Sequence, residues 1–72
     1  MKKIKKIKIK INGKIKSITQ DSNISIVLKN LKIPLNKVAI ELNEEIIDKK
    51  KINEIKLNKN DKIEIVHFIG GG

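Results

Sequence analysis

The C-terminal stretch, residues 62–72, places the strongest constraint on the fold. Its first part is rich in Ile and Val and partly alternates between apolar and polar side chains, which is typical of a buried β-strand. Gly70, Gly71 and Gly72 then end the chain. Because glycine has no Cβ, this peptide neither packs well nor holds an extended conformation. We therefore predict a strand that presents residues 69–72 as an exposed tail, able to reach about 13 Å beyond the sheet.

Length and composition indicate one small domain over residues 1–72. A chain of 72 residues is long enough for one compact core, and the apolar residues available for that core are almost entirely Ile, Leu and Val. There is no Cys, which excludes disulfides, a thiolate nucleophile and a Cys-ligated metal. Phe68 is the single aromatic residue, so the chain has no stacking platform for nucleic-acid bases.

The net charge of +9 leaves a nucleic-acid-binding module open as an alternative of a different class. However, the lysines occur in nearly every loop and strand, and there is no Arg to make bidentate phosphate or base contacts. We therefore favour a compositional bias over a binding patch. Lys8 and Lys10 interrupt the apolar stretch that a signal peptide needs, and no apolar run approaches about 18 residues. A cytoplasmic protein is expected.

The N-terminal pattern predicts a β-hairpin. Ile7, Ile9 and Ile11 alternate with lysines, as in a strand with one buried face, and Asn12-Gly13 is a strong turn signal. A two-residue turn would pair Ile11 with Lys14 and Ile9 with Lys16, which places lysines on the core face. We therefore predict a three-residue loop over 12–14, which pairs Ile11 with Ile15 and Ile9 with Ser17. The second strand then covers about residues 15–19.

A short helix and further strands follow. Ile24, Val27, Leu28 and Leu31 have helical spacing, Asn23 or Ser25 can cap the helix, and Pro34 ends it. Strands are predicted over 38–42 and 46–47. The polar stretch 48–60 is expected to be held to the core by Ile52, Ile55 and Leu57. This order predicts an α+β domain with the helix on one face of a mixed sheet and with the first and last strands central.

Several segments resemble one known family. Residues 38–43 with 45–47, and residues 60–72 with their terminal glycines, are similar to the thiamine-biosynthesis sulfur carrier family ThiS. Residues 9–14 match that family's opening strand and turn. The resemblance covers about residues 6–72 and implies the ubiquitin-like β-grasp fold, with four to five strands. The family usually has Gly where Glu44 and Asn60 stand; Asn60 tolerates a left-handed backbone, whereas Glu44 indicates a different turn.

The resemblance also implies a chemistry. A ThiF-like enzyme adenylates the Gly72 carboxylate with ATP, a desulfurase system supplies sulfur that displaces AMP, and a ThiG-like thiazole synthase uses the resulting thiocarboxylate. In that cycle Gly70 and Gly71 thread the tail through a narrow channel, where a Cβ would collide. No residue of the chain is expected to act as a catalytic group or metal ligand, and no cofactor is expected to be bound. We expect a monomer.

Val66, Phe68 and Ile69 are candidate partner contacts, because they lie next to the tail and aromatic residues are enriched in interface cores. For Phe68, closure of the hydrophobic core is an equally good interpretation. His67 is the single histidine and is expected to be solvated or hydrogen-bonded rather than a metal ligand. The lysines at positions 6, 8 and 10 are expected to form the solvent-exposed face of their strand. Alternatively, they steer docking onto an acidic partner.

Other functions share this fold. The small subunit of molybdopterin synthase (MoaD-like) and tRNA-thiolation carriers use the same thiocarboxylate, and a protein-conjugating modifier is also open. The segment leading into the glycines favours ThiS among them. A nucleic-acid-binding module would instead show steeply salt-dependent binding that is indifferent to loss of Gly71 and Gly72.

Overall fold

The computed structural model describes residues 5–68. Its elements, in chain order, are β1 (Lys6–Ile11), β2 (Lys14–Thr19), α1 (Ile24–Asn30), the short 3-10 helix η1 (Leu35–Lys37), β3 (Val38–Leu42), β4 (Glu45–Ile46), the 3-10 helix η2 (Lys49–Lys51) and β5 (Lys62–His67). The predictions made for Ile69, Gly70, Gly71 and Gly72 lie outside these residues.

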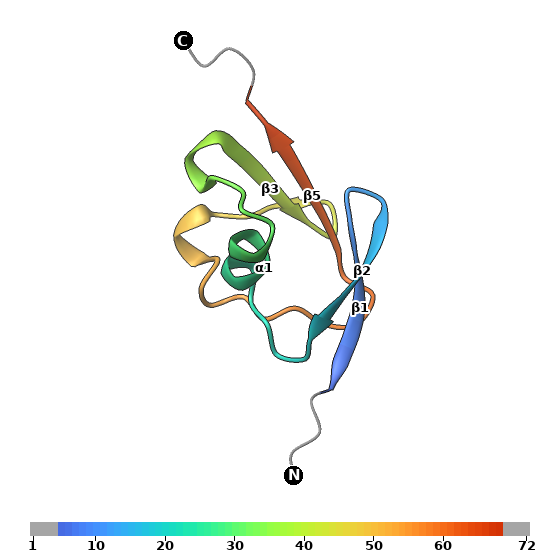
Figure 1. Cartoon of the computed structure of the whole chain (residues 1–72). Helices are drawn as coiled ribbons and strands as arrows, with labels where there is room; N and C mark the ends of the chain where they lie inside the picture. Colours follow the sequence, from blue (N-terminus) through green and yellow to red (C-terminus); the bar gives the residue numbers. More distant parts are fainter. Residues whose placement is uncertain (1–4, 69–72) are drawn as a thin grey trace.

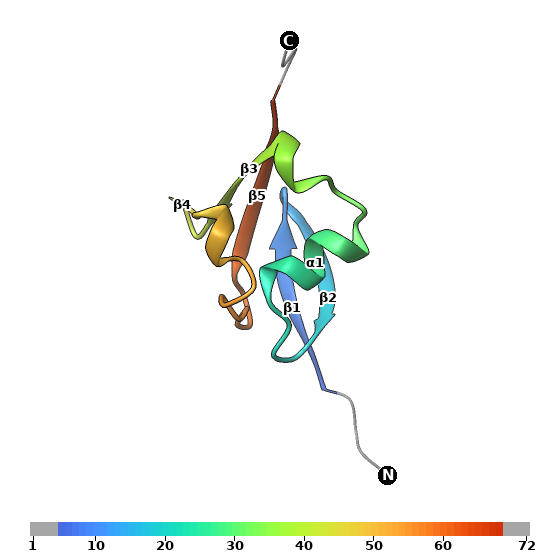
Figure 2. The same cartoon turned by 90° about the vertical axis from the view of Figure 1, so that its left-hand side faces the viewer.

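The strands form one five-stranded sheet in the order β2-β1-β5-β3-β4. β1 and β5 run parallel at its centre, while the β1–β2, β3–β5 and β3–β4 pairs are antiparallel. Figure 1 shows α1 to the left of the sheet, and Figure 2, turned by 90°, shows it in front of β1 and β2, so the helix covers one face of the sheet. The predicted mixed sheet, its single covered face and its two central strands are confirmed.

The core lies between the sheet and α1. Every second residue of the central strands points into it, and α1 contributes the face that the helical spacing predicted. Its fully buried side chains with the largest volumes are Ile9, Ile24, Ile40, Ile63 and Val38. Because these residues alternate with charged or exposed ones along the strands, the other face of the sheet stays open to solvent.

The predicted three-residue hairpin loop is wrong. β1 and β2 are joined by Asn12-Gly13 alone, and the register pairs Ile11 with Lys14 and Ile9 with Lys16. Both turn residues have positive φ, 50° and 83°, as a two-residue turn of this kind requires. The lysines are tolerated opposite buried isoleucines because β2 is an edge strand, where α1 does not enclose them and both stay exposed.

The helix agrees closely with its sequence signals. The Asn23 side chain accepts a hydrogen bond from the Ile26 N–H at 2.8 Å, which confirms Asn23 as the N-cap. Ile24, Val27 and Leu28 are buried as predicted, whereas Leu31 follows the last helical residue and remains partly exposed.

The stretch from 48 to 60 is attached to the core by the residues that were predicted to hold it. Ile52 and Leu57 are buried and Ile55 packs against the same cluster. An isolated bridge between Asn23 and Lys56 ties the stretch to the start of α1. β4 begins one residue earlier than predicted, at Glu45, because Asn43-Glu44 alone makes the preceding turn.

Candidate functional site

β5 brings the chain to the point where the terminal glycines begin. Ile63 and Ile65 anchor this strand in the core, while Val66, His67 and Phe68 at its end are exposed. Val66 is 54% exposed and Phe68 56% exposed. Two of the three predicted partner contacts are therefore accessible apolar side chains, and the interpretation of Phe68 as a residue that closes the core is wrong. Ile69 lies outside the described residues.

Two turn asparagines fix β5 from its two sides. On the β1 side, Asn12 Oδ1 accepts from the Ile65 N–H at 2.7 Å and Asn12 Nδ2 donates to the Ile65 carbonyl at 3.3 Å. On the β3 side, Asn43 Oδ1 accepts from the Lys62 N–H at 2.9 Å. Each amide thus takes a position that a neighbouring strand would fill. In the sequence Asn12 is part of a turn signal and Asn43 lies between two predicted strands, and neither position indicates a contact with β5.

Glu44 shows how the start of β5 is stabilised electrostatically. The Lys62 ammonium donates to Glu44 Oε2 at 3.0 Å, and this hydrogen bond, with the charge of Glu44, raises the pKa of Lys62 above its ordinary value. Glu44 has a φ of 73° and Asn60 a φ of 71°, so both have the left-handed backbone that glycine favours. Glu44 therefore keeps a backbone conformation that glycine could also adopt, and no different turn is needed to explain a Glu at this position.

Phe68 is held at the base of the tail by two contacts. Its N–H donates to the Lys37 carbonyl at 2.9 Å, which continues the β3–β5 ladder by one residue. The Lys49 ammonium lies 5.0 Å from the centre of the Phe68 ring, within range of a cation–π interaction. The ring is thus oriented at the point where the described chain ends, yet more than half of its surface is free to contact another protein.

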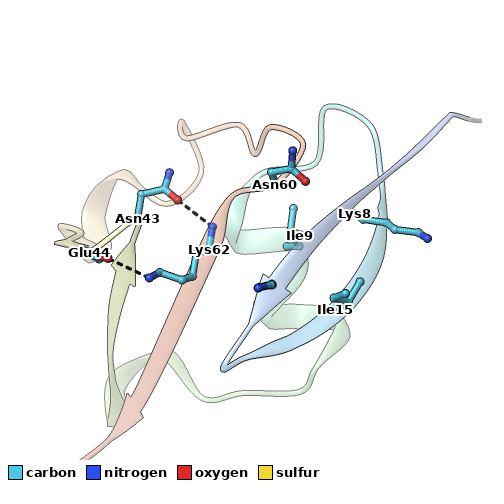
Figure 3. Close-up of a pocket in the computed structure, with 8 residues that line it drawn as sticks. Lys8, Ile9, Ile15, Asn43, Glu44, Asn60 and Lys62 are labelled. Atoms are coloured by element: carbon cyan, nitrogen blue, oxygen red, sulfur yellow. Dashed lines mark hydrogen bonds and ion pairs between the residues drawn. The ribbon is translucent and has the colours of Figure 1, made fainter.

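A cavity of about 580 Å³ lies at the other end of β5. Figure 3 shows the Lys62 side chain bonded to Glu44 and the Lys62 N–H bonded to Asn43, with Ile9 on the neighbouring strand β1. Lys8 points away from these residues in the same view. The basic side chains that line the cavity therefore do not converge on a common point. The cavity is a solvent-exposed depression at the edge of the open face of the sheet.

Within residues 5–68, no three or more His, Cys, Asp or Glu side chains come close enough to hold a metal ion. His67 is exposed and stands apart from any such cluster in that range. Among the same residues, no helix has the length and apolar character needed to cross a bilayer.

Comparison with known proteins gives one consistent result. The sequence model of the ThiS family matches residues 9–72. The sulfur carrier protein ThiS of Bacillus subtilis is 38% identical over 65 residues, which cover 89% of this chain and 98% of that protein. The crystal structure of the thiamine biosynthesis protein ThiS from Geobacter metallireducens superposes with a TM-score of 0.80 at 26% identity, covering 92% of this chain and all of that one.

Longer proteins match as well. The thiazole synthase of Paramagnetospirillum magneticum is 38% identical over 66 residues, which cover 92% of this chain but 20% of that protein. The family match, the full-length likeness to a carrier and the shared β-grasp fold agree with one another. The chain belongs to the ThiS family of sulfur carrier proteins.

Proposed function

We propose that the C-terminal carboxylate of Gly72 is the group on which this protein carries sulfur for thiazole formation in thiamine biosynthesis. The observation that supports this most is the construction of β5. The strand is anchored in the core at Ile63 and Ile65 and bound on both sides. It is followed directly by the exposed Phe68, which stands four residues before Gly72. A rigid strand followed by glycines is suited to presenting a terminus to an enzyme.

The chemistry needs an activated carboxylate. Attack of a Gly72 carboxylate oxygen on ATP, in an adenylating enzyme, forms an acyl-adenylate and releases pyrophosphate. Hydrosulfide supplied by a desulfurase system then attacks the acyl carbon, forming the C–S bond while the C–O bond to AMP breaks, so AMP leaves with the bond electrons and the thiocarboxylate remains. Gly72 has no side chain to obstruct this attack, and Gly70 and Gly71 allow close approach of a channel wall. The partner's contacts must offset an ordering cost of about 1 kcal/mol or more for each tail residue.

The proposed user of the sulfur is a thiazole synthase. Support comes from the thiazole synthases of Paramagnetospirillum magneticum and Magnetococcus marinus, in which a segment similar to this chain makes up 20% of one longer polypeptide. A carrier and a synthase joined in one chain are expected to work on the same reaction. The adenylating enzyme and the desulfurase system are part of the proposal on chemical grounds, because the carboxylate is inert without them. Because the adenylating enzyme needs ATP, we propose that the cycle runs in the cytoplasm.

Genetic complementation tests the proposal. In Bacillus subtilis lacking its own ThiS, the full chain is expected to restore growth without thiamine, whereas a chain lacking Gly71 and Gly72 is not. Added thiazole should restore growth of the strain that carries the shortened chain. Restoration of molybdopterin synthesis in a strain lacking a MoaD-like subunit, without restoration of thiamine synthesis, would assign the carrier to the other pathway.

A further inference from the structure

The peptide groups of β5 alternate between two neighbours. Lys62 and Phe68 bond to the β3 side, through the Asn43 N–H and the Lys37 carbonyl. Ile63 and Ile65 bond to the β1 side, through the Asn12 backbone and side chain. Since successive residues of a strand direct their N–H and C=O groups to opposite edges, His67 directs both of its groups to the β1 side.

Nothing in the described chain meets His67 on that side. β1 ends at Ile11, and the Asn12 amide extends the ladder only as far as Ile65. His67 lies opposite Val38 of β3, at a position of the antiparallel ladder whose N–H and C=O groups point away from β3, because the next residue, Phe68, is the one that bonds to Lys37. Within residues 5–68, the pairing of β5 with β1 stops at Ile63, and the His67 side chain is exposed. Figure 1 shows β5 continuing past the tip of the β1–β2 hairpin while β3 still accompanies it on the other side. The last part of β5 is therefore paired on one edge and open on the other.

We propose that a thiazole synthase binds this open edge by adding an extended segment of its own as a strand, with the first shared hydrogen bonds at His67. The proposal deepens the carrier function and rests on it. An edge with free N–H and C=O groups is a template for another strand, and main-chain pairing of this kind supplies affinity whatever side chains the partner offers. The Asn12 side chain already bonds to the N–H and C=O of Ile65. The shared ladder therefore starts at the next residue that faces this side, His67.

The position of the edge fits the task. A strand added at His67 lies beside the residues that precede the glycines, so it fixes the direction in which the tail leaves the sheet. Val66 and Phe68 flank His67 with exposed apolar side chains, which gives the added segment a surface to cover. The cavity at the opposite end of β5 offers no such control over the tail, because Lys62 is separated from the glycines by the whole strand.

Amide hydrogen exchange of the isotopically labelled carrier, alone and saturated with the thiazole synthase of the same organism, tests the proposal. In the free protein the His67 N–H is expected to exchange rapidly and the Ile65 N–H slowly. In the complex the His67 exchange rate should fall by about tenfold or more, while Ile65 stays slow. Fast exchange at His67 in the saturated complex would overturn strand addition and leave the carrier function standing; no complex at any concentration would contradict both.

A chemically synthesised chain with an N-methylated His67 provides the matched test in binding. This change removes the donor but no hydrogen bond that the described chain makes, so thermal unfolding should be unaltered. Affinity for the synthase is expected to fall by about fivefold to tenfold, the range for one lost hydrogen bond. The control His67→Ala, which keeps the N–H and loses the imidazole, should bind within about twofold of the parent. Equal affinity of the N-methylated and parent chains would refute the proposal.

Discussion

Asn12 and Ile65 are 53 positions apart, and the side chain of the first makes two hydrogen bonds to the backbone of the second, at 2.7 and 3.3 Å. The contact lies at the end of the parallel β1–β5 pair, where β1 stops and β5 continues beside β3. It joins the hairpin turn directly to the strand that precedes the tail. Asn12 thus both forms the hairpin turn and holds β5, the strand that leads to the terminal glycines.

Replacing Asn12 by Gly should lower the free energy of unfolding by about 1–3 kcal/mol, because the Ile65 N–H and C=O lose their partner while the positive φ remains accessible. Asn12→Asp keeps the acceptor for the Ile65 N–H and loses the donor, so its stability should lie between the two. Urea unfolding measures both variants. A Gly variant as stable as the parent would show that the contact contributes little.

Glu44 has a left-handed backbone, with φ at 73°, which residues with a Cβ adopt only at an energetic cost. Glu44→Gly should therefore be more stable than Glu44→Ala by about 1 kcal/mol. Both variants lose the ion pair to Lys62, so the comparison isolates the backbone. Thermal or urea unfolding of the two decides the matter, and a more stable Ala variant would count against strain at this turn.

The raised pKa of Lys62 predicts a specific pH dependence. Because the folded-state pKa lies above the unfolded one, the stabilisation is complete below the ordinary lysine pKa of about 10.4 and is lost as the pH rises through the folded value. The stability difference between the parent and Glu44→Gln should be constant near neutral pH and shrink in alkali. Direct NMR titration of Lys62 should also give a lower pKa in the variant; an identical pKa would exclude Glu44 as the cause.

Phe68→Ala should weaken binding to a thiazole synthase by about tenfold, as expected for an exposed aromatic residue at the centre of an interface. Its effect on unfolding should be small, because the ring is 56% exposed. Ile26→Ala is the matched control, since Ile26 is 44% exposed but lies on α1, away from the tail. Equal losses of affinity in the two variants would remove Phe68 from the binding surface.

The periodicity of the sequence was sufficient for most of the fold. Alternation predicted β1 and β5, and helical spacing predicted the buried face of α1, because burial on one side of an element imposes these periods directly. The hairpin failed for a physical reason. The prediction assumed that every residue opposite Ile9 must be buried, whereas Lys16 sits on an edge strand that the helix does not cover.

The candidate site was predictable only in part. Val66 and Phe68 were candidate contacts because of their place next to the glycines, but the sequence left burial of Phe68 in the core equally open, and the structure shows both to be exposed. The hydrogen bonds of Asn12 and Asn43 to β5 join residues far apart in the chain, and no local pattern announces such contacts. The open edge at His67 depends on where a neighbouring strand stops, which is a property of the assembled sheet.

Intact-mass spectrometry of the carrier, incubated with its adenylating enzyme, ATP and a sulfur donor, tests the central claim most directly. The account predicts that one oxygen of the protein is replaced by sulfur, that fragmentation places the change at Gly72, and that a chain lacking Gly71 and Gly72 stays unmodified. An unchanged mass with enzymes that modify another ThiS protein, or sulfur attached anywhere but the terminal residue, would contradict it.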